Sequence, residues 1–450
     1  MLKSKEIDML HGTIWNKMII FAIPLAFTGM LQQLYNTADI AVLGQFEGTN
    51  AMAAVGNNIS FIGILINLFL GLSLGANVII ARFIGARQNY RVEEAVRTAF
   101  YLALLAGGFL TVLGELVTGF VNSSLGVPPE VEEMANLYLR VYLLGMPVMS
   151  LYDFEAAILR ANGDTGTPLI ALAIASLANI IMNLAFVSIG WGVAGVALAT
   201  VLANVVSAGI LFRTLTTTDS VLRLKLTPVR MNVAMLARIA KIGLPAGIQG
   251  MVFCLSNILI QAAINSLGAD TMAASAAAFT IEINVYCFVS AFAQATTTFV
   301  SQNYGAGNLP RCFRIARTGL CLAIAFTVVI ASLVLILADE TLGFFSDEAD
   351  VIELGKIRLW YIVAPEFLQS FIDILSGALR GYGLSLAPAM YTLLGICGVR
   401  ITWLYTVFPL HPGFDVLMGC YSFSWLVAGG FIIVLYRKFT KKLKQQRNLK

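Results

Sequence analysis

Carboxyl, amide and hydroxyl side chains interrupt some of the longest apolar stretches of the chain. Asp39 ends a polar run that begins at Gln32, with apolar residues on both sides of the run. Asn179 and Asn183 are four residues apart, so they share one face of a helix, and Thr200 follows in the next apolar stretch. An acid beside carbonyl and hydroxyl oxygens can bind and release a proton or coordinate Na⁺. We therefore take Asp39, Asn179, Asn183 and Thr200 as candidate ion-coupling residues. The alternative for the three neutral side chains is hydrogen bonding between helices, and the alternative for Asp39 is a cap of the helix end near Gly44.

No pattern typical of an enzyme active site accompanies these groups. The two histidines, His11 and His411, lie near opposite ends of the chain, and the sequence has no HExxH, GxSxG or GxxxxGK[ST] motif. The six cysteines show no CxxC spacing, and most lie in apolar segments, where a thiol behaves as a small hydrophobe. We expect no enzyme activity and no cofactor, and an ion gradient rather than ATP as the energy source.

The composition indicates that lipid is the main solvent of this chain. Hydrophobic residues make up 58% of it and charged residues 12%, about half of the ~25% that is usual in soluble domains. An apolar stretch of about twenty residues can span a bilayer as a helix. The first such stretch is too long for the core of a signal peptide. Apolar stretches predict twelve transmembrane helices, at residues 15–43, 54–80, 95–118, 134–158, 167–188, 192–213, 238–266, 274–300, 315–337, 354–378, 386–409 and 415–436.

Basic residues collect on alternate connections between the predicted helices. Examples are Arg87 after the second helix, Arg314 after the eighth, and the basic tail over residues 437–450. The intervening connections, such as 267–273, contain no Lys or Arg. Because basic loops stay in the cytoplasm, we predict a multi-pass protein of the cell membrane with both termini cytoplasmic. The basic residues form no single patch of the kind that binds nucleic acid, so no nucleic-acid partner is expected.

The second half of the chain repeats the first. At an offset of 220 residues, Gly85, Arg160 and Pro168 fall on Gly305, Arg380 and Pro388. Because each copy has an even number of predicted helices, both enter the membrane in the same direction, and a pseudo-two-fold axis along the membrane normal relates them. We predict an all-α membrane protein with a six-helix lobe at 1–213, a cytoplasmic linker at 214–237, and a second six-helix lobe at 238–450 that ends in the basic tail.

Further residues within the predicted helices are functional candidates, because a charge at mid-membrane costs about 2.5–3.5 kcal/mol on insertion scales. Pro24 and Pro245, in the first helix of each lobe, can act as hinges, since proline removes a backbone hydrogen bond. For Asp373, seven residues before Arg380, a structural pair with that arginine is the favoured reading. Arg400 needs a carboxylate partner that the sequence does not identify. Candidates for a substrate cavity are Gln32, Tyr35, Asn36, Glu155, Glu282 and Asp373.

Four motifs, taken together, are typical of one transporter family. They lie at residues 35–44, 158–168, 192–197 and 302–308. With them the chain resembles the multidrug and toxic compound extrusion (MATE) family, in particular its DNA-damage-inducible-F-like bacterial subgroup. The resemblance implies two lobes that form a V, a central cavity for organic cations or other amphiphiles, and antiport against H⁺ or Na⁺.

The resemblance also suggests a role for particular residues. It makes Asp39 the ion-coupling acid, with Asn179 and Thr200 in the same site, where Na⁺ could bind. Relatives in the subgroup often carry Asp at the position of Asn183. The loss of that carboxylate favours a proton site centred on Asp39 without excluding Na⁺.

These features predict a secondary-active multidrug exporter. We expect a monomer whose partners are small amphiphilic or cationic substrates and the lipid bilayer. The alternative is a flippase or exporter of lipid-linked sugars from the same superfamily. A flippase cavity should be lined by basic residues, whereas most charges at mid-membrane depth in this chain are acidic. A receptor or scaffold, the third class, would show no ion-coupled flux.

Overall fold

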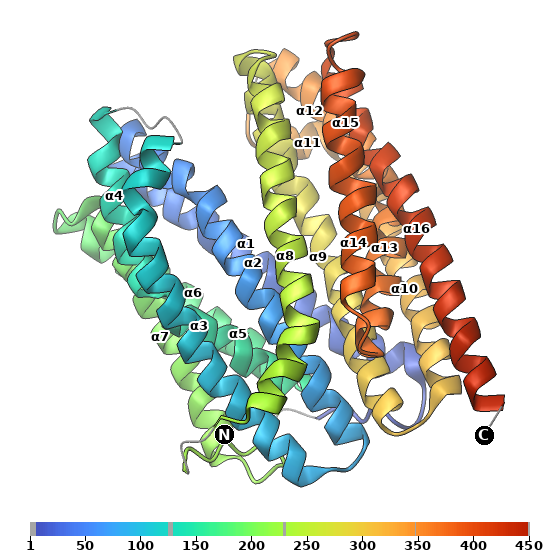
Figure 1. Ribbon diagram of the computed structural model, residues 1–450. Coiled ribbons are helices and arrows are strands. Elements are labelled where there is room, and N and C mark those ends of the chain that lie inside the picture. Colours follow the sequence, from blue (N-terminus) through green and yellow to red (C-terminus); the bar gives the residue numbers. More distant parts are fainter. Residues whose placement is uncertain (1–5, 125–128, 228–230, 347, 449–450) are drawn as a thin grey trace. The chain divides into compact units, whose positions relative to one another are not determined.

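The computed structural model describes residues 6–124, 129–227, 231–346 and 348–448, and the regular secondary structure within these ranges is helical (Figure 1). A helix satisfies its backbone polar groups internally, which lipid cannot do for it. The first half contains α1 (Ile14–Phe46), α2 (Thr49–Gly85), α3 (Asn89–Ser124), α4 (Pro129–Leu144), α5 (Met146–Ala161), α6 (Gly166–Ser188) and α7 (Gly192–Thr217). The second half contains α8 (Val233–Asn265), α9 (Ala269–Gly305), α10 (Leu309–Ile336), α11 (Ala338–Gly343), α12 (Ala349–Ile362), η1 (Ala364–Glu366), α13 (Phe367–Gly381), α14 (Leu386–Leu393), η2 (Leu394–Gly398), α15 (Val399–Thr406) and α16 (Phe414–Asn448).

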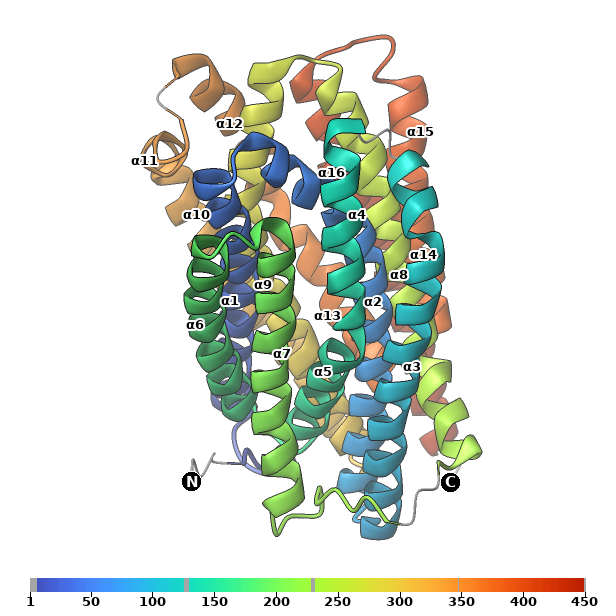
Figure 2. The same cartoon turned by 90° about the vertical axis from the view of Figure 1, so that its left-hand side faces the viewer.

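The predicted twelve spans are confirmed, and one of them is broken. Within the described ranges, eleven helical segments are long and apolar enough to cross a membrane, and a bent pair makes a twelfth. This pair is α4 and α5, which meet at an angle of 47°; the bend is visible in Figure 2. Gly145 separates the two helices and Pro147 lies in the first turn of α5. In the second half the corresponding span, Ala349–Gly381, contains Pro365 within the 3-10 turn η1 but counts as one continuous span.

The chain forms two compact units, and each consists of two stretches of sequence. One unit comprises Met1–Asp8 and Phe27–Gly247, and the other comprises Met9–Ala26 and Ile248–Lys450. The division cuts α1 after Ala26 and α8 after Gly247, in each case two residues beyond a helix-internal proline. By packing, the units therefore divide inside the first helix of each repeat. The sequence division at 1–213, 214–237 and 238–450 describes the repeat and stays a prediction.

Glycines allow two helices of the first unit to approach closely. Gly71 and Gly75 of α2 face Gly243 and Gly247 in the first part of α8, and each pair has the small-xxx-small spacing of membrane helix contacts. A Cβ on Gly71 would collide with the backbone of Gly247, and a Cβ on Gly243 would lie 2.7 Å from the Cα of Leu72. This contact therefore fixes the first part of α8 on α2.

Candidate ion-coupling site

Three helices of the first unit bring polar side chains around Asp39. Asp39 lies on α1 and is 3% exposed. Asn183 of α6 donates a hydrogen bond from Nδ2 to Asp39 Oδ1 (2.6 Å), and Thr200 of α7 donates from Oγ1 to Asp39 Oδ2 (2.8 Å). Asn179 lies one turn before Asn183 on α6, and its Oδ1 accepts a second hydrogen bond from Asn183 Nδ2 (3.0 Å). The structure thus brings together all four residues that the sequence analysis selected as ion-coupling candidates.

Tyr35 and Asn204 hold the backbone of α7 against α1. The Tyr35 hydroxyl donates to the carbonyl oxygen of Thr200 (3.0 Å), and Asn204 Nδ2 donates to the same carbonyl (2.9 Å) and to the Tyr35 hydroxyl (3.4 Å). Tyr35 lies one turn before Asp39, so the same face of α1 supplies both contacts. These bonds fix the distance between the Thr200 side chain and the carboxylate. The sequence analysis missed Asn204, although it lies four residues after Thr200 on the same helix face.

Asp39 is a buried acid that has no compensating positive charge in the described part of the chain. Among the described residues no lysine, arginine or histidine forms an ion pair with it, and its hydrogen-bond partners are neutral. Burying an ionised carboxylate in a low-dielectric interior costs several kcal/mol unless it is paired. A proton or a metal cation would neutralise this charge, and water that enters the site would solvate it. The site has the chemistry needed to bind a cation and release it when water enters.

The orientation of the Asn183 amide bears on which cation fits. Its Nδ2 atom donates to Asp39 Oδ1 and Asn179 Oδ1, so an N–H donor group occupies the space between these two oxygens. Asn183 Oδ1 is buried without a hydrogen-bond partner among the described residues. A Na⁺ ion needs oxygen ligands, and the amide would have to turn over to offer one. A proton needs no such rearrangement.

The other candidates from the sequence lie elsewhere. Asn36 is exposed and Gln32 half-buried, and neither joins the hydrogen bonds around Asp39. Glu155 of α5 is 1% exposed, and its two carboxylate oxygens have no hydrogen-bond partner in the described part of the chain.

Asp373 of α13 accepts a hydrogen bond from Gln369 (3.1 Å), while Arg380 donates to Gln249 (2.7 Å). The structural pair of Asp373 with Arg380 is thus not a direct hydrogen bond.

Glu282 of α9 is already bound by an arginine. Arg358 of α12 donates from Nη2 to Glu282 Oε1 (2.6 Å) and from Nε to Glu282 Oε2 (3.0 Å). The sequence contained an indication of this pair. Arg358 is one of the few basic residues near the side of the membrane where the connections between helices contain no Lys or Arg. The role of Glu282 in a substrate cavity stays a prediction. A cationic substrate bound there would compete with Arg358 for the carboxylate.

Comparison with known proteins gives the family. The MatE family model matches residues 24–185 and 245–406, two stretches that begin 221 residues apart, as the internal repeat requires. The "Probable multidrug resistance protein NorM" of Thermotoga maritima is 28% identical over 394 residues, which cover 86% of this chain and 84% of that protein. The "Probable multidrug resistance protein YoeA" of Bacillus subtilis is 25% identical, with 86% of each chain covered.

A solved structure shares the fold along almost the whole length of the chain. A structure described as the outward-facing conformation of a multidrug resistance MATE family transporter superposes with a TM-score of 0.90 at 22% identity and covers 98% of this chain. The matching helices, the duplicated family match and the two similar bacterial proteins agree with one another. The chain belongs to the multidrug and toxic compound extrusion (MATE) family and is a multi-pass membrane protein.

Proposed function

We propose that this protein exports organic cations or other amphiphilic compounds in exchange for protons, and that Asp39 carries the proton. The observation behind the proposal is the buried Asp39 carboxylate, which accepts hydrogen bonds from two neutral side chains and forms no ion pair with a basic residue in the described part of the chain. Family membership and the multidrug resistance names of two relatives support export of small molecules. Competition between a proton and a cationic substrate for one buried site gives obligatory exchange.

Thr200 can serve Asp39 in both protonation states. Its Oγ1 atom lies 2.8 Å from Asp39 Oδ2 and 3.0 Å from the carbonyl oxygen of Val196, but a hydroxyl group has a single proton to donate. When Asp39 is ionised, Thr200 donates to the carboxylate. When Asp39 is protonated, Asp39 donates to Thr200 Oγ1, which in turn donates to Val196. The proton can therefore bind and leave while Asp39 Oδ2 and Thr200 Oγ1 keep a hydrogen bond to each other, with little movement of heavy atoms.

Na⁺ is the alternative coupling ion, with Asp39, Asn179 and Thr200 as ligands. The Asn183 amide favours the proton, because its N–H₂ group points at the oxygens that Na⁺ would need. The neighbouring Asn179 Nδ2 also donates, to Thr200 Oγ1 (3.5 Å).

We further propose that the protein works as a monomer in the cell membrane with both termini in the cytoplasm. The alternation of basic connections supports this orientation. Pro24 and Pro245 are proposed as the hinges of alternating access. Each lies two residues before the point where its helix passes from one compact unit to the other.

Everted membrane vesicles that contain the protein test the proposal with each gradient imposed separately. We expect an outward-directed H⁺ gradient, with the lumen acidic, to drive accumulation of a fluorescent cation, and an outward-directed Na⁺ gradient without a pH difference to drive none. Accumulation under the Na⁺ gradient alone would make Na⁺ the coupling ion. Accumulation under neither gradient, with the protein present and folded, would contradict secondary-active export.

A further inference from the structure

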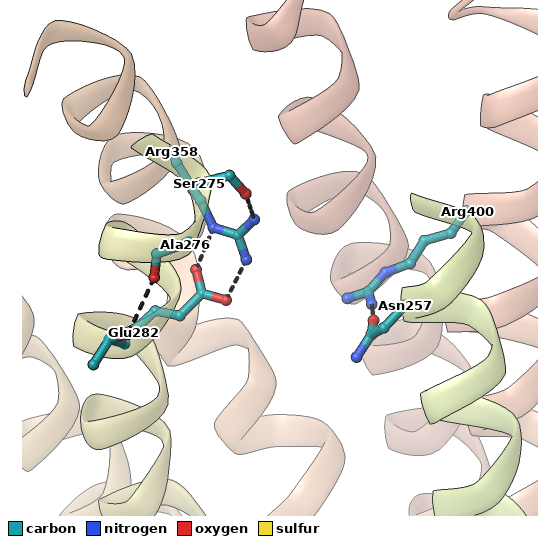
Figure 3. A network of polar contacts seen from close by, with 7 residues as sticks. Asn257, Ser275, Ala276, Glu282, Arg358 and Arg400 are labelled. Carbon is teal, nitrogen blue, oxygen red and sulfur yellow. Dashed lines mark hydrogen bonds and ion pairs between the residues drawn. The ribbon is translucent and has the colours of Figure 1, made fainter. Parts of the chain in front are cut away.

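Arg400 is a buried cation of the second unit, and its hydrogen-bond partners within the described ranges are neutral. It lies on α15 and is 7% exposed. Its Nε donates to Ser424 Oγ (3.2 Å) and its Nη1 to Asn257 Oδ1 (3.3 Å); Figure 3 shows the guanidinium facing Asn257. Both acceptors are neutral, and both distances are at or beyond the upper end for an N–H···O bond. Within the described ranges no aspartate or glutamate forms an ion pair with Arg400.

The cluster formed by Arg400, Tyr421, Arg358 and Glu282 contains one acid, and that acid is bound by Arg358. Arg358 binds both carboxylate oxygens of Glu282 and also donates from Nη1 to Ser275 (2.6 Å), as Figure 3 shows. The ring of Tyr421 lies within cation–π distance of both guanidinium groups. Its centroid is 4.0 Å from Arg400 Cζ and 5.9 Å from Arg358 Cζ. These four residues carry two positive charges and one negative charge. Arg358 is thus paired with Glu282, and an anion that entered the cluster would pair with Arg400.

Arg400 keeps donors with which it could bind such an anion. A guanidinium group has five N–H donors, and the two hydrogen bonds to Ser424 and Asn257 use two of them. The remaining three lie on Nη1 and Nη2, whose shared edge is the fork that binds a carboxylate with two parallel bonds. Asn257 is exposed, so the neighbour of the buried guanidinium reaches the surface of the protein. The hydrogen bond from Nη1 to Asn257 therefore joins the buried guanidinium to a residue at the surface.

An irregular helical segment sets the direction of Arg400. The π-helical turn η2 ends at Gly398, two residues before Arg400. One extra residue in a turn rotates the helix beyond it by about 100°, and such turns are frequent at functional sites. Gly395 in this turn packs against Ala428 of α16, where an added Cβ would lie 2.6 Å from the Cβ of Ala428. Tight packing thus holds an otherwise unfavourable turn that directs Arg400 toward α8 and α16.

We propose that Arg400 binds the carboxylate group of a zwitterionic amphiphile, so that the exporter accepts compounds with an acidic group as well as simple cations. Two N–H groups of the guanidinium would hold the carboxylate, and Asn257 Nδ2 could donate a further hydrogen bond. A charged arginine inside a membrane helix is costly, and an anionic partner offsets that cost. The assignment of the ligand as a transported compound rests on the proposed export function, whereas the binding site itself does not.

Binding to the purified full-length protein in a chloride-free buffer tests this inference. The probes are a rhodamine with a free carboxylate and its methyl ester, which differ only in the acidic group, and the readout is fluorescence polarisation. We expect Arg400→Gln to weaken binding of the free acid by about tenfold or more and to change ester binding less than about twofold. Arg400→Lys keeps the charge without the fork, so the acid should bind with intermediate affinity. Arg140→Gln, at an exposed arginine 3.9 Å from Glu115, is the matched control and should change neither affinity.

Three results would overturn the inference. The first is that Arg400→Gln binds the acid as tightly as the wild type does. The second is that Arg400→Gln loses affinity for the acid and the ester equally. The third is that chloride raises the melting temperature of the wild type but not of Arg400→Gln, and yet does not displace the acid. The last result would assign the site to an inorganic anion. If Arg400→Gln does not fold, Arg400→Lys replaces it. A lower ratio of acid to ester affinity than in the wild type supports the inference, and an unchanged ratio contradicts it. If the acid binds through Arg400 but vesicles export neither probe, the proposed function fails and this site stands.

Discussion

Thr200 has one proton and two acceptors within reach, and this makes it the most informative single residue of the site. Replacement by Val keeps the shape and removes the hydroxyl, so both protonation states of Asp39 lose a partner. A hydrogen bond to a charged group contributes about 1.5–3 kcal/mol, so we expect Thr200→Val to lower proton-driven efflux about tenfold or more. Thr200→Ser, which keeps the hydroxyl, should retain most of the activity. Equal efflux by Thr200→Val and the wild type in everted vesicles would contradict this role.

Asn183 provides a second test at the residue scale. Asn183→Asp places a second acid 2.6 Å from Asp39 Oδ1, and two carboxylates this close cannot both be ionised without a cation between them. We expect the variant to gain Na⁺-dependent efflux that the wild type lacks, because carboxylate oxygens are ligands that Na⁺ accepts. The measurement is dye efflux under a Na⁺ gradient with no pH difference. A variant that stays indifferent to Na⁺ would argue against the amide as the group that selects the proton.

Part of the site could be predicted from residue types and spacing, and part could not. Helical periodicity placed Asn179 and Asn183 on one face, and burial of a charge in lipid singled out Asp39. The contact of Asn204 with Tyr35 depends on how α7 packs against α1, which no local pattern encodes. The partners of Arg400 are neutral, so the expectation of a carboxylate partner was wrong for the described part of the chain.

At the scale of elements, glycine packing between α2 and α8 predicts a position that tolerates no side chain. Gly243→Val forces its Cβ into the backbone of α2, and overpacking of this kind typically costs about 1–3 kcal/mol. We expect a melting temperature in detergent that is lower by several degrees. Gly108→Ala is the matched control, because nothing lies within 4 Å of a Cβ there and alanine favours a helix. Equal melting temperatures for the two variants would contradict the close approach of α2 and α8.

Pro24 predicts a change in transport rather than in binding. In Pro24→Ala the helix regains an N–H donor, which straightens and stiffens α1 near the boundary between the compact units. We expect a slower transport rate with substrate affinity within about twofold, since the contacts of Asp39 are unchanged. Pro310→Ala is the control, because proline in the first turn of α10 removes no intrahelical bond. Unaltered transport by Pro24→Ala would remove the hinge assignment.

The helices themselves were predictable because apolar length and loop charge are properties of the sequence. All twelve predicted spans overlap a helical segment of the structure. The break between α4 and α5 was missed, since Gly145 and Pro147 interrupt hydrogen bonding without interrupting the apolar character of the span. The change of unit within α1 was equally hidden, because it arises from packing between distant segments.

For the whole molecule, the distribution of basic residues predicts the topology. The basic tail over residues 437–450 should keep the C-terminus in the cytoplasm. We expect a fluorescent protein fused to the C-terminus to fluoresce, and an alkaline phosphatase fused there to be inactive. The same phosphatase inserted at 410–414, between the last two spans, should be active. The opposite pattern would reverse the orientation and with it the direction of export.

The central claim concerns linkage between substrate and proton at Asp39, and proton release on substrate binding measures it directly. Purified protein in weakly buffered detergent solution is mixed with an organic cation, and a pH indicator records released protons. Because exchange requires that two ligands oppose each other, the wild type should release about one proton per bound cation. Asp39→Asn should bind the cation and release none. Proton release by Asp39→Asn equal to that of the wild type would contradict the account.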